Sequence, residues 1–209
     1  MNVPNDYIKA QYEVNKQHSN HQVESDNEEA IDRVKDFAKW VKQSQLPSGS
    51  FLDAGCRTGY AMDELAIQFP AAEVVGCDIV PQFIERAQLR GEAVVADLHD
   101  LPFDDQQFDW VFTNTVIEHC HDAKLAASEL LRVARVGCLC ITDLEDEARF
   151  RHNASHFTYH NNPVEWVDVF RNPDFWLMKL DVPRYSQINM LWIRKEFVAK
   201  HNEEYNIPC

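Results

Sequence analysis

The feature that most constrains the fold of this chain is a regular alternation, across its middle, of short apolar segments with amphipathic ones. Short apolar runs bounded by turn residues are typical of buried strands, whereas the stretches between them place apolar residues at helical spacing. Buried strands separated by helices predict a parallel sheet covered on both faces, and right-handed crossovers make it a doubly wound, Rossmann-like α/β sheet. The predicted strands are residues 51–55, 73–78, 92–97, 108–114 and 137–144, and the predicted helices are residues 61–69, 81–91 and 122–135.

The flanking segments bring the predicted sheet to seven strands. Residues 25–43 carry an apolar stripe at helical spacing, so they predict a helix that Ser25 or Asp26 caps. The C-terminal third predicts one more helix at 162–172 and two strands at 175–182 and 188–197. The short connection between these strands favours an antiparallel hairpin, so the sheet is expected to be mostly parallel with an antiparallel C-terminal hairpin.

Charge is spread unevenly and disfavours a nucleic-acid partner. The formal net charge is −14, and residues 51–150 hold seven Lys and Arg against 19 Asp and Glu. Nucleic-acid binding is driven by basic side chains that neutralise phosphates, and no basic stripe is visible. An acidic middle region suits a cationic ligand better.

The sequence predicts a protein without a membrane span, located in the cytoplasm. No apolar run approaches the roughly 20 residues that a membrane helix needs. The first 20 residues are polar and lack the apolar core of a signal peptide.

No metal site is expected from the cysteines and histidines. None of the six cysteines forms a C-x-x-C pair, and Cys138 and Cys140 are expected to share one face of a strand as small buried residues. His119 and His121 lie close to Cys120, but this spacing fits no usual zinc pattern.

The turn after the first predicted strand, "LDAGCRTG" at residues 52–59, indicates the ligand. A dinucleotide site needs G-x-G-x-x-G and a P-loop needs Lys-Ser/Thr after its last glycine, and the chain has neither. What remains is Asp-x-Gly-x-x-x-Gly, in which an acid ends the strand. Its carboxylate would repel a pyrophosphate but would attract an ammonium or a sulfonium, and S-adenosylmethionine carries both.

Four motifs in order resemble the class I S-adenosylmethionine-dependent methyltransferases, in particular the methyltransferase domain 11 type of small-molecule enzymes. The resemblance covers about residues 48–144 and rests on these stretches: "LDAGCRTG", "VVGCDIVPQFIERA", "VVADLHDLPFDDQQFDWVFTNTVIEH" and "LLRVARVGCLCITD". It implies one methyltransferase domain over residues 1–209. Its expected parts are an N-terminal arm and helix (1–46), a cofactor-binding core (48–144) and an acceptor-side cap with the last strands (145–209).

The resemblance also implies a cofactor, S-adenosylmethionine, with S-adenosylhomocysteine as product. Asp53 would bind the cofactor's ammonium directly or through water, Asp78 the ribose hydroxyls and Asp97 the adenine amino group. The implied cofactor-binding residues are Asp53, Ala54, Gly55, Cys56, Arg57, Gly59, Asp78, Ile79, Asp97, Leu98, Asn114 and Thr115.

Several of these positions also have a plain structural interpretation. Asp78 can cap the helix that begins near Pro81, and Asp97 can be an acid of a surface turn. Ile79 and Leu98 either sandwich the adenine or simply belong to the core. Asn114 either lines the methyl-transfer mouth, with its main-chain carbonyl offered there, or merely ends a strand.

Arg57 departs from the pattern, because the family usually places glycine there. An arginine fits if its φ angle is ordinary and its side chain points away from the ligand. It can alternatively pair with the cofactor's carboxylate, or block the pocket.

Candidate acceptor-side residues follow the fourth and fifth predicted strands. Glu118 and His119 match a Glu-His pair common in small methyltransferases, so they are either a general base for the acceptor or residues that stabilise the site through neighbouring loops. A second group after the fifth strand can shape an acceptor pocket or be a solvated loop, and it comprises His152, His156, Tyr159 and His160. Tyr7 and Tyr12 are expected to close over the cofactor.

The function expected from this resemblance is methyl transfer to a small molecule, such as a sugar, a lipid precursor or another metabolite, by in-line displacement. Two alternatives remain open. One is a non-catalytic binding or scaffold protein that retains the fold, which the departure at Arg57 suggests. The other is a methyltransferase acting on a protein or RNA.

Overall fold

A computed structural model describes residues 20–144, 156–182 and 187–198, with side chains described from Glu28 onward. One seven-stranded sheet organises these residues, with strand order β3-β2-β1-β4-β5-β7-β6. Neighbouring strands among the first five are parallel, whereas β7 is antiparallel to both β5 and β6. The strands are β1 (Ser50–Ala54), β2 (Glu73–Asp78), β3 (Glu92–Val95), β4 (Phe108–Asn114), β5 (Ala134–Asp143), β6 (Phe175–Asp181) and β7 (Gln187–Arg194).

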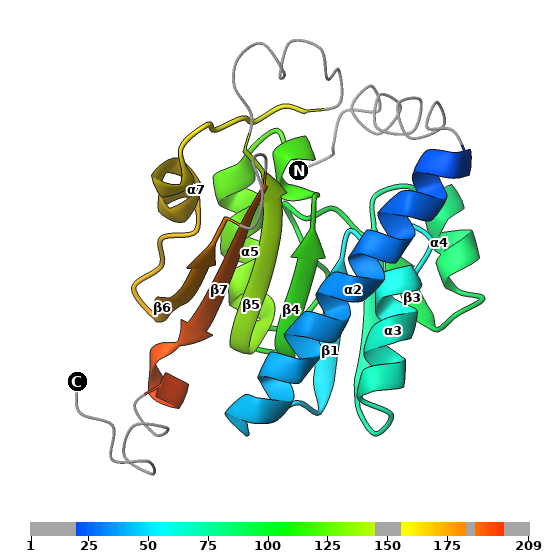
Figure 1. Ribbon diagram of the computed structural model, residues 1–209, viewed down its shortest axis with the longest axis horizontal. Helices are drawn as coiled ribbons and strands as arrows, with labels where there is room; N and C mark the ends of the chain where they lie inside the picture. Colours follow the sequence, from blue (N-terminus) through cyan, green and yellow to red (C-terminus); the bar gives the residue numbers. More distant parts are fainter. Residues whose placement is uncertain (1–19, 145–155, 183–186, 199–209) are drawn as a thin grey trace.

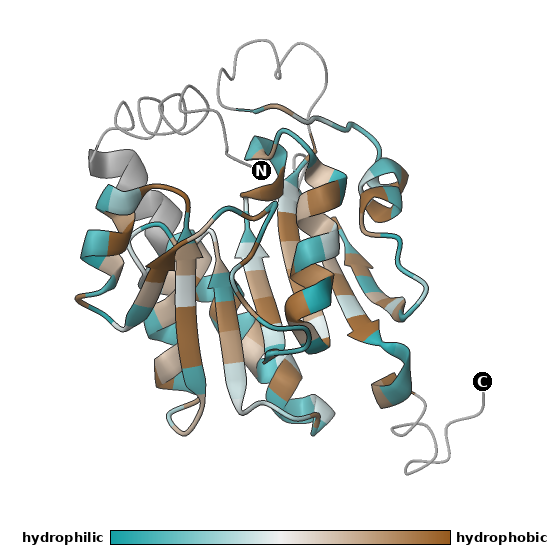
Figure 2. Cartoon of the chain, turned by 180° about the vertical axis from the view of Figure 1, so that it is seen from behind, coloured by the Kyte–Doolittle hydropathy of each residue, from teal (hydrophilic) through white to brown (hydrophobic). Residues whose placement is uncertain are grey.

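Helices cover both faces of this sheet (Figure 1). Helices α2 and α3 pack on one face, where their apolar residues form a core cluster with those of β1, β4, β5 and β7. Helices α5 and α7 contribute to the cluster on the other face, seen from behind in Figure 2. The helices are α2 (Asn20–Ser44), α3 (Tyr60–Gln68), α4 (Pro81–Ala87), the 3-10 helix η1 (Ile117–His119), α5 (Ala123–Val133), α7 (Pro163–Val169) and a last turn at 195–198.

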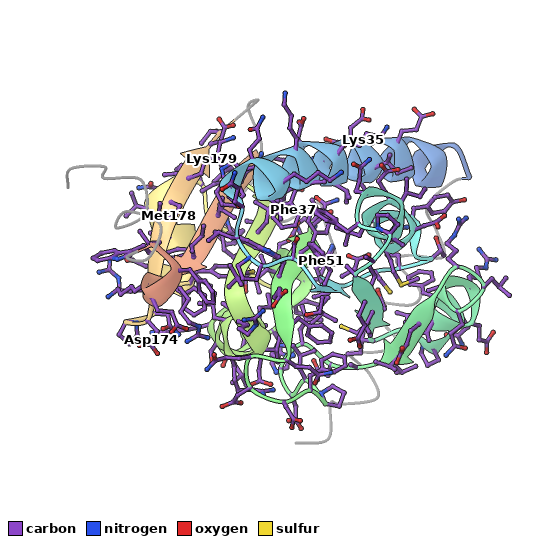
Figure 3. The ribbon with its side chains drawn as sticks, turned by 90° about the horizontal axis from the view of Figure 1, so that it is seen from below. Lys35, Phe37, Phe51, Asp174, Met178 and Lys179 are labelled. Carbon is purple, nitrogen blue, oxygen red and sulfur yellow. The ribbon has the colours of Figure 1, made fainter. Side chains whose placement is uncertain are left out.

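Helix α2 is held to the sheet by aromatic side chains. The ring of Phe37 makes edge-to-face contacts with Phe51 on β1, at 6.5 Å between centroids, and with Trp110 on β4, at 5.6 Å. In Figure 3, Phe37 points from α2 toward Phe51, whereas Lys35 points away from the sheet. Such aromatic pairs add about 0.5–1.5 kcal/mol each beyond the apolar area they bury. The long helix is thereby fixed over the middle of the sheet.

The predicted α/β class, the seven strands and the antiparallel C-terminal hairpin are confirmed, but two helix boundaries were wrong. Helix α2 begins at Asn20, so Ser25 and Asp26 lie within it rather than at its start. Helix α4 ends at Ala87, because the chain forms tighter turns over the next residues, where Arg90 N–H donates to the Ala87 carbonyl. Asp122 caps α5 as predicted, since its side chain accepts from Leu125 N–H at 2.9 Å. The division into arm, core and cap stays a prediction.

The predicted cysteine packing holds for the five cysteines that the structure describes, all of which are buried with free thiols. Cys138 and Cys140 lie in one core cluster, as two residues on the same face of a strand should. Within the described ranges, no helix combines the length and the apolar character needed to cross a membrane.

The strand order fixes where a ligand can bind. From β1 the chain proceeds outward to β2 and β3, and it then returns to place β4 on the other side of β1. The connections that leave β1 and β4 therefore diverge at the carboxyl ends of these strands. Ligands of open α/β sheets bind at such a switch point.

Candidate active site

Polar residues end the four strands on either side of the switch point. Asp53 is the last but one residue of β1, Asp78 ends β2, Asn114 ends β4, and Asp97 follows β3 by two residues. Because these four strands are parallel neighbours, their carboxyl ends share one edge of the sheet. The tertiary structure thus brings together the four polar residues to which the sequence assigned cofactor contacts.

The turn from β1 into α3 is tight and depends on its glycines. Gly55 has a φ of 82°, and a Cβ atom added there would lie 2.3 Å from a methyl carbon of Val116. Gly59 has a φ of 86° and precedes α3, and an added Cβ would lie 3.2 Å from the Cα of Ala87 on α4. Both positions combine a left-handed backbone with close neighbours, so only glycine fits without strain.

Arg57 corrects one expectation, because its φ angle is not ordinary. Arg57 has a φ of 47°, which lies in the left-handed region. The turn requires this conformation of whichever residue stands there, and that explains why glycine is the usual choice. The Arg57 guanidinium lies 5.8 Å from the centre of the Phe83 ring on α4. Arginine is therefore accommodated at a local backbone cost of about 1–2 kcal/mol.

Asp78 is buried and held by main-chain donors. Its Oδ1 accepts from Val80 N–H at 2.9 Å, and its Oδ2 accepts from Arg57 N–H at 3.0 Å. Burial raises the pKa of Asp78, while these N–H groups and the Arg57 charge oppose the rise. Val80, not Asp78, is the N-cap residue of α4 and makes no side-chain cap. An ionised carboxylate accepts about four hydrogen bonds, so both oxygens keep capacity for a ligand.

Asp53 is the most deeply buried of the three aspartates at the switch point. Its side chain is 2% exposed, and its Oδ2 has no hydrogen-bond partner among the described residues. Burial, with a smaller contribution from the charge of Asp78, raises the pKa of Asp53 to about 7, although a hydrogen bond from Met62 N–H opposes the rise. A buried carboxylate oxygen without a donor is costly, and a cationic ligand group would relieve that cost.

Asp97 already has an internal partner. Its Oδ1 lies 2.6 Å from Nδ1 of His99 and accepts from His99 N–H at 3.1 Å. Burial alone would raise the pKa of Asp97, but these hydrogen bonds outweigh it and lower the pKa. The neighbouring Leu98 is buried in the core cluster, which is what its plain structural interpretation predicts, whereas Ile79 is only half-buried.

Arg33, which the sequence did not single out, holds the Asn114 side chain at the end of β4. Arg33, on α2, donates to Oδ1 of Asn114 and to Oε1 of Gln187, and it forms an ion pair with Glu29. Thr115 adopts a φ of 52°, and its hydroxyl donates to the Asn114 carbonyl at 2.8 Å. Arg33 thus joins α2 to the switch point and to the start of β7. In the sequence, Arg33 looks like any charged residue on an amphipathic helix, so nothing there indicates this contact.

The acceptor-side candidates divide into a cluster and two outlying residues. Glu118 and His119 lie in η1, and the His119 ring contacts that of His156 at 4.6 Å between centroids. His160 instead pairs with Glu165 at 3.1 Å and packs on Trp166, and Tyr159 is exposed. His152, Tyr7 and Tyr12 lie outside the described residues.

Glu118 has the contacts of a structural residue. It is 1% exposed, and its Oε2 accepts from the Thr142 hydroxyl on β5 at 2.9 Å. Its main-chain carbonyl accepts from Phe157 N–H at 2.9 Å and from Thr158 N–H at 3.1 Å. These bonds attach the segment after β5 to η1, as the stabilising interpretation of Glu118 expects.

The strand order, the antiparallel C-terminal hairpin and the acid-lined switch point define the class I methyltransferase fold. Residues 52–142 match the family model described as methyltransferase domain. The fold superposes on magnesium protoporphyrin IX methyltransferase from Synechocystis PCC 6803 with bound SAH, with a TM-score of 0.65 and 16% identity over 91% of this chain and 95% of that one. A SAM-dependent methyltransferase from Aquifex aeolicus gives a TM-score of 0.59 and 15% identity over 78% and 98% of the two chains.

Sequence relatives carry the same domain. A malonyl-[acyl-carrier protein] O-methyltransferase from Legionella pneumophila is 37% identical over 100 residues, which are 44% of this chain and 35% of the relative. One of the same name from Halorhodospira halophila is 38% identical over 88 residues, or 39% and 30% of the two chains. The chain thus matches about a third of the length of these relatives. Residues 52–142 thus resemble the methyltransferase domain, and the seven-stranded sheet has the fold of the solved S-adenosylmethionine-dependent methyltransferases.

Proposed function

We propose that this protein transfers a methyl group from S-adenosylmethionine to a small-molecule acceptor by in-line displacement. The observation that carries the proposal is the buried Oδ2 of Asp53, which lacks a donor among the described residues at the very edge where the fold binds its ligand. An ammonium group supplies both the charge and the N–H donor that this oxygen needs. The neighbouring Asp78 fits the ribose, since both of its oxygens retain lone pairs for hydroxyl donors.

The adenine end of the proposed site rests on Asp97 and Ile79. Asp97 uses Oδ1 for His99, so its other oxygen is the one to accept from the adenine amino group. Ile79 is half-buried and offers an apolar surface to the ring. Leu98 contributes mainly through the core, with a smaller part in the contact. Ala54, Cys56 and the glycines shape the turn around the methionine part.

When bound, the cofactor supplies a methyl group that is already activated on a sulfonium. The contribution of the chain is therefore mainly alignment, which accelerates a reaction by fixing the two partners in an in-line geometry. Asn114 and Thr115 border the reaction site, and Arg33 fixes the Asn114 side chain. His119 is the residue we propose as base where the acceptor keeps its proton, since Glu118 is bound to Thr142.

The proposed acceptor class is a lipid precursor or a comparable small metabolite. The relatives that share the domain are named for methylation of malonyl-[acyl-carrier protein], a carboxylate acceptor on a carrier. The net charge of −14 argues against a nucleic-acid substrate. A location in the cytoplasm stays a prediction from the sequence.

Calorimetric titration with S-adenosylmethionine and S-adenosylhomocysteine tests the cofactor site. Asp78→Ala and Asp53→Asn are expected to weaken binding at least tenfold. Asp63→Asn is the matched control, because Asp63 follows the same turn but pairs on the surface with Arg90 at 3.0 Å. The control should bind like the wild type, and circular dichroism confirms that each variant is folded.

The same samples then separate the competing functions. Cofactor binding followed by methylation of a malonyl thioester or another small acceptor supports the proposal. Binding without transfer to any acceptor favours the scaffold function. Failure of the folded wild type to bind either ligand means that Arg57 closes the pocket, and it overturns the proposed activity.

A further inference from the structure

We propose that Glu118, His119 and His156 form a binding site for one divalent transition-metal ion, with Zn²⁺ as the best-fitting probe. One potential ligand atom from each of the three side chains lies within 4.8 Å of the other two. A carboxylate and two imidazoles are ligands that Zn²⁺, Co²⁺ and Mn²⁺ accept, whereas Mg²⁺ and Ca²⁺ prefer all-oxygen sites. The chemistry of the donors therefore selects a transition metal over a hard cation.

The sequence predicted no metal site here, because only histidines and cysteines close together in the chain can be recognised by their spacing. His121 is not part of the cluster, since its ring stacks on that of His99 at 3.9 Å between centroids. The second imidazole comes instead from His156, on the segment that follows β5. Only the tertiary structure places this histidine beside His119, with the two rings nearly perpendicular at 80°.

The backbone around the cluster is fixed before any ion binds. The segment from His156 is held to η1 by the hydrogen bonds of Phe157 and Thr158 N–H to the Glu118 carbonyl, and the Thr158 hydroxyl donates to the Cys120 carbonyl at 3.2 Å. Thr142 orients the Glu118 carboxylate from β5. Partners of this kind, outside the ligands themselves, typically raise metal affinity 10- to 100-fold.

The burial and charge of the cluster also suit a cation. Glu118 is 1% exposed and His156 is 8% exposed, so the cluster is largely shielded from water. Such shielding strengthens the attraction between a dication and the Glu118 carboxylate. Zn–N and Zn–O distances of about 2.0–2.2 Å place ligand atoms roughly 3.3–3.5 Å apart. The ligand atoms, which lie within 4.8 Å of one another, would draw together to this separation when an ion binds.

Three protein ligands leave one coordination position open, as in catalytic zinc sites. A water molecule or an oxygen of the acceptor can occupy it. The test of this site is independent of methyl transfer, because metal binding can be measured in the absence of the cofactor and of any acceptor. Its failure would leave the proposed methyl transfer and the His119 base untouched, whereas an ion on His119 would exclude the coordinating ring nitrogen as that base without excluding methyl transfer.

The test is a titration of the full chain, freed of metal by a chelator, with Zn²⁺ in a calorimeter. We expect one tight site per chain, weakened at least tenfold by His156→Gln and by His119→Gln. His121→Gln is the matched control and should bind as tightly as the wild type. Mg²⁺ should give no comparable binding. Equal Zn²⁺ affinity in the wild type and in folded His156→Gln would overturn the proposal, as would the absence of a tight site.

A second measurement needs no variant. Co²⁺ bound to the wild-type protein should give the largest, through-bond shifts in its NMR spectrum to the ring resonances of the two histidines that coordinate it, and assignment to His119 and His156 supports the site. Largest shifts on other histidines, or a spectrum without such shifts, would contradict it even where a substituted protein fails to fold.

Discussion

The main-chain N–H of Arg57 donates to Oδ2 of Asp78 over 3.0 Å, and this bond ties the turn after β1 to the acid that ends β2. The bond comes from the backbone, so it survives any side chain that tolerates the left-handed conformation at position 57. The position of the Asp78 carboxylate, which we propose binds the ribose, therefore depends on the turn after β1. A substitution that alters the backbone of the turn should therefore shift the Asp78 carboxylate.

Substitutions of Arg57 should separate backbone strain from side-chain effects. Arg57→Gly and Arg57→Ala both remove the guanidinium, but only glycine adopts a φ of 47° without cost. We expect Arg57→Gly to be more stable than Arg57→Ala by about 1 kcal/mol in urea unfolding. Equal stability of the two variants would show that the residue does not hold a left-handed conformation in solution.

Gly55 should tolerate alanine only when Val116 is shortened. The new Cβ would lie 2.3 and 2.7 Å from the two methyl carbons of Val116, in addition to the strain at a φ of 82°. We expect Gly55→Ala to lower the free energy of unfolding by roughly 3 kcal/mol or more. In a Val116→Ala background the same change should cost only about 1–2 kcal/mol. A double-mutant cycle measures this coupling, and additive costs would contradict the close packing.

Asp53 should make cofactor affinity depend on pH. Its pKa is raised by burial to about 7, so the folded protein without ligand keeps an extra proton there between about pH 4 and 7. Binding of a cationic ammonium favours the ionised carboxylate and releases that proton. We expect affinity for S-adenosylhomocysteine to fall as pH decreases below 7, by up to tenfold per unit. The dependence should flatten in Asp53→Asn, and parallel profiles would argue against contact with the ammonium.

The raised pKa of Asp53 also makes the unfolding free energy of the ligand-free protein depend on pH. A carboxyl whose folded pKa exceeds its unfolded pKa binds more protons when folded, so its contribution to stability is largest below the unfolded value and is lost as pH rises through the folded value. Stability from Asp53 should thus decrease between about pH 4 and 7. The difference in unfolding free energy between wild type and Asp53→Asn, measured across this range, isolates the effect. A flat difference would show that the pKa is not raised.

Arg33 should stabilise the protein far more than an exposed arginine does. Arg33→Met leaves the side chains of Asn114 and Gln187 without their donor beneath α2, and we expect a loss of about 1–3 kcal/mol in unfolding free energy. Arg171→Met is the control, since the exposed Arg171 pairs on the surface with Asp168, and its loss should cost under about 0.5 kcal/mol. Similar losses in both variants would refute the role of Arg33 as a clamp.

The sequence by itself determined the sheet, its helices and the line of acids at the switch point. Apolar runs and helical spacing report burial, and burial is a property of each segment, so the strands were found to within a few residues. The sequence could place Asp53 and Asp78 at one edge of the sheet, because the carboxyl ends of neighbouring parallel strands share that edge. Their contacts with the cofactor stay predictions.

The tertiary structure alone decided the contacts between segments far apart in the chain. The left-handed φ of Arg57 follows from the path of the turn between β1 and α3, which overrides the preference of arginine. The clamp of Arg33 on Asn114 and the pairing of His119 with His156 depend on how α2 and the segment after β5 dock on the sheet. Side-chain periodicity carries no information on such docking, because it depends on three-dimensional packing of complete elements.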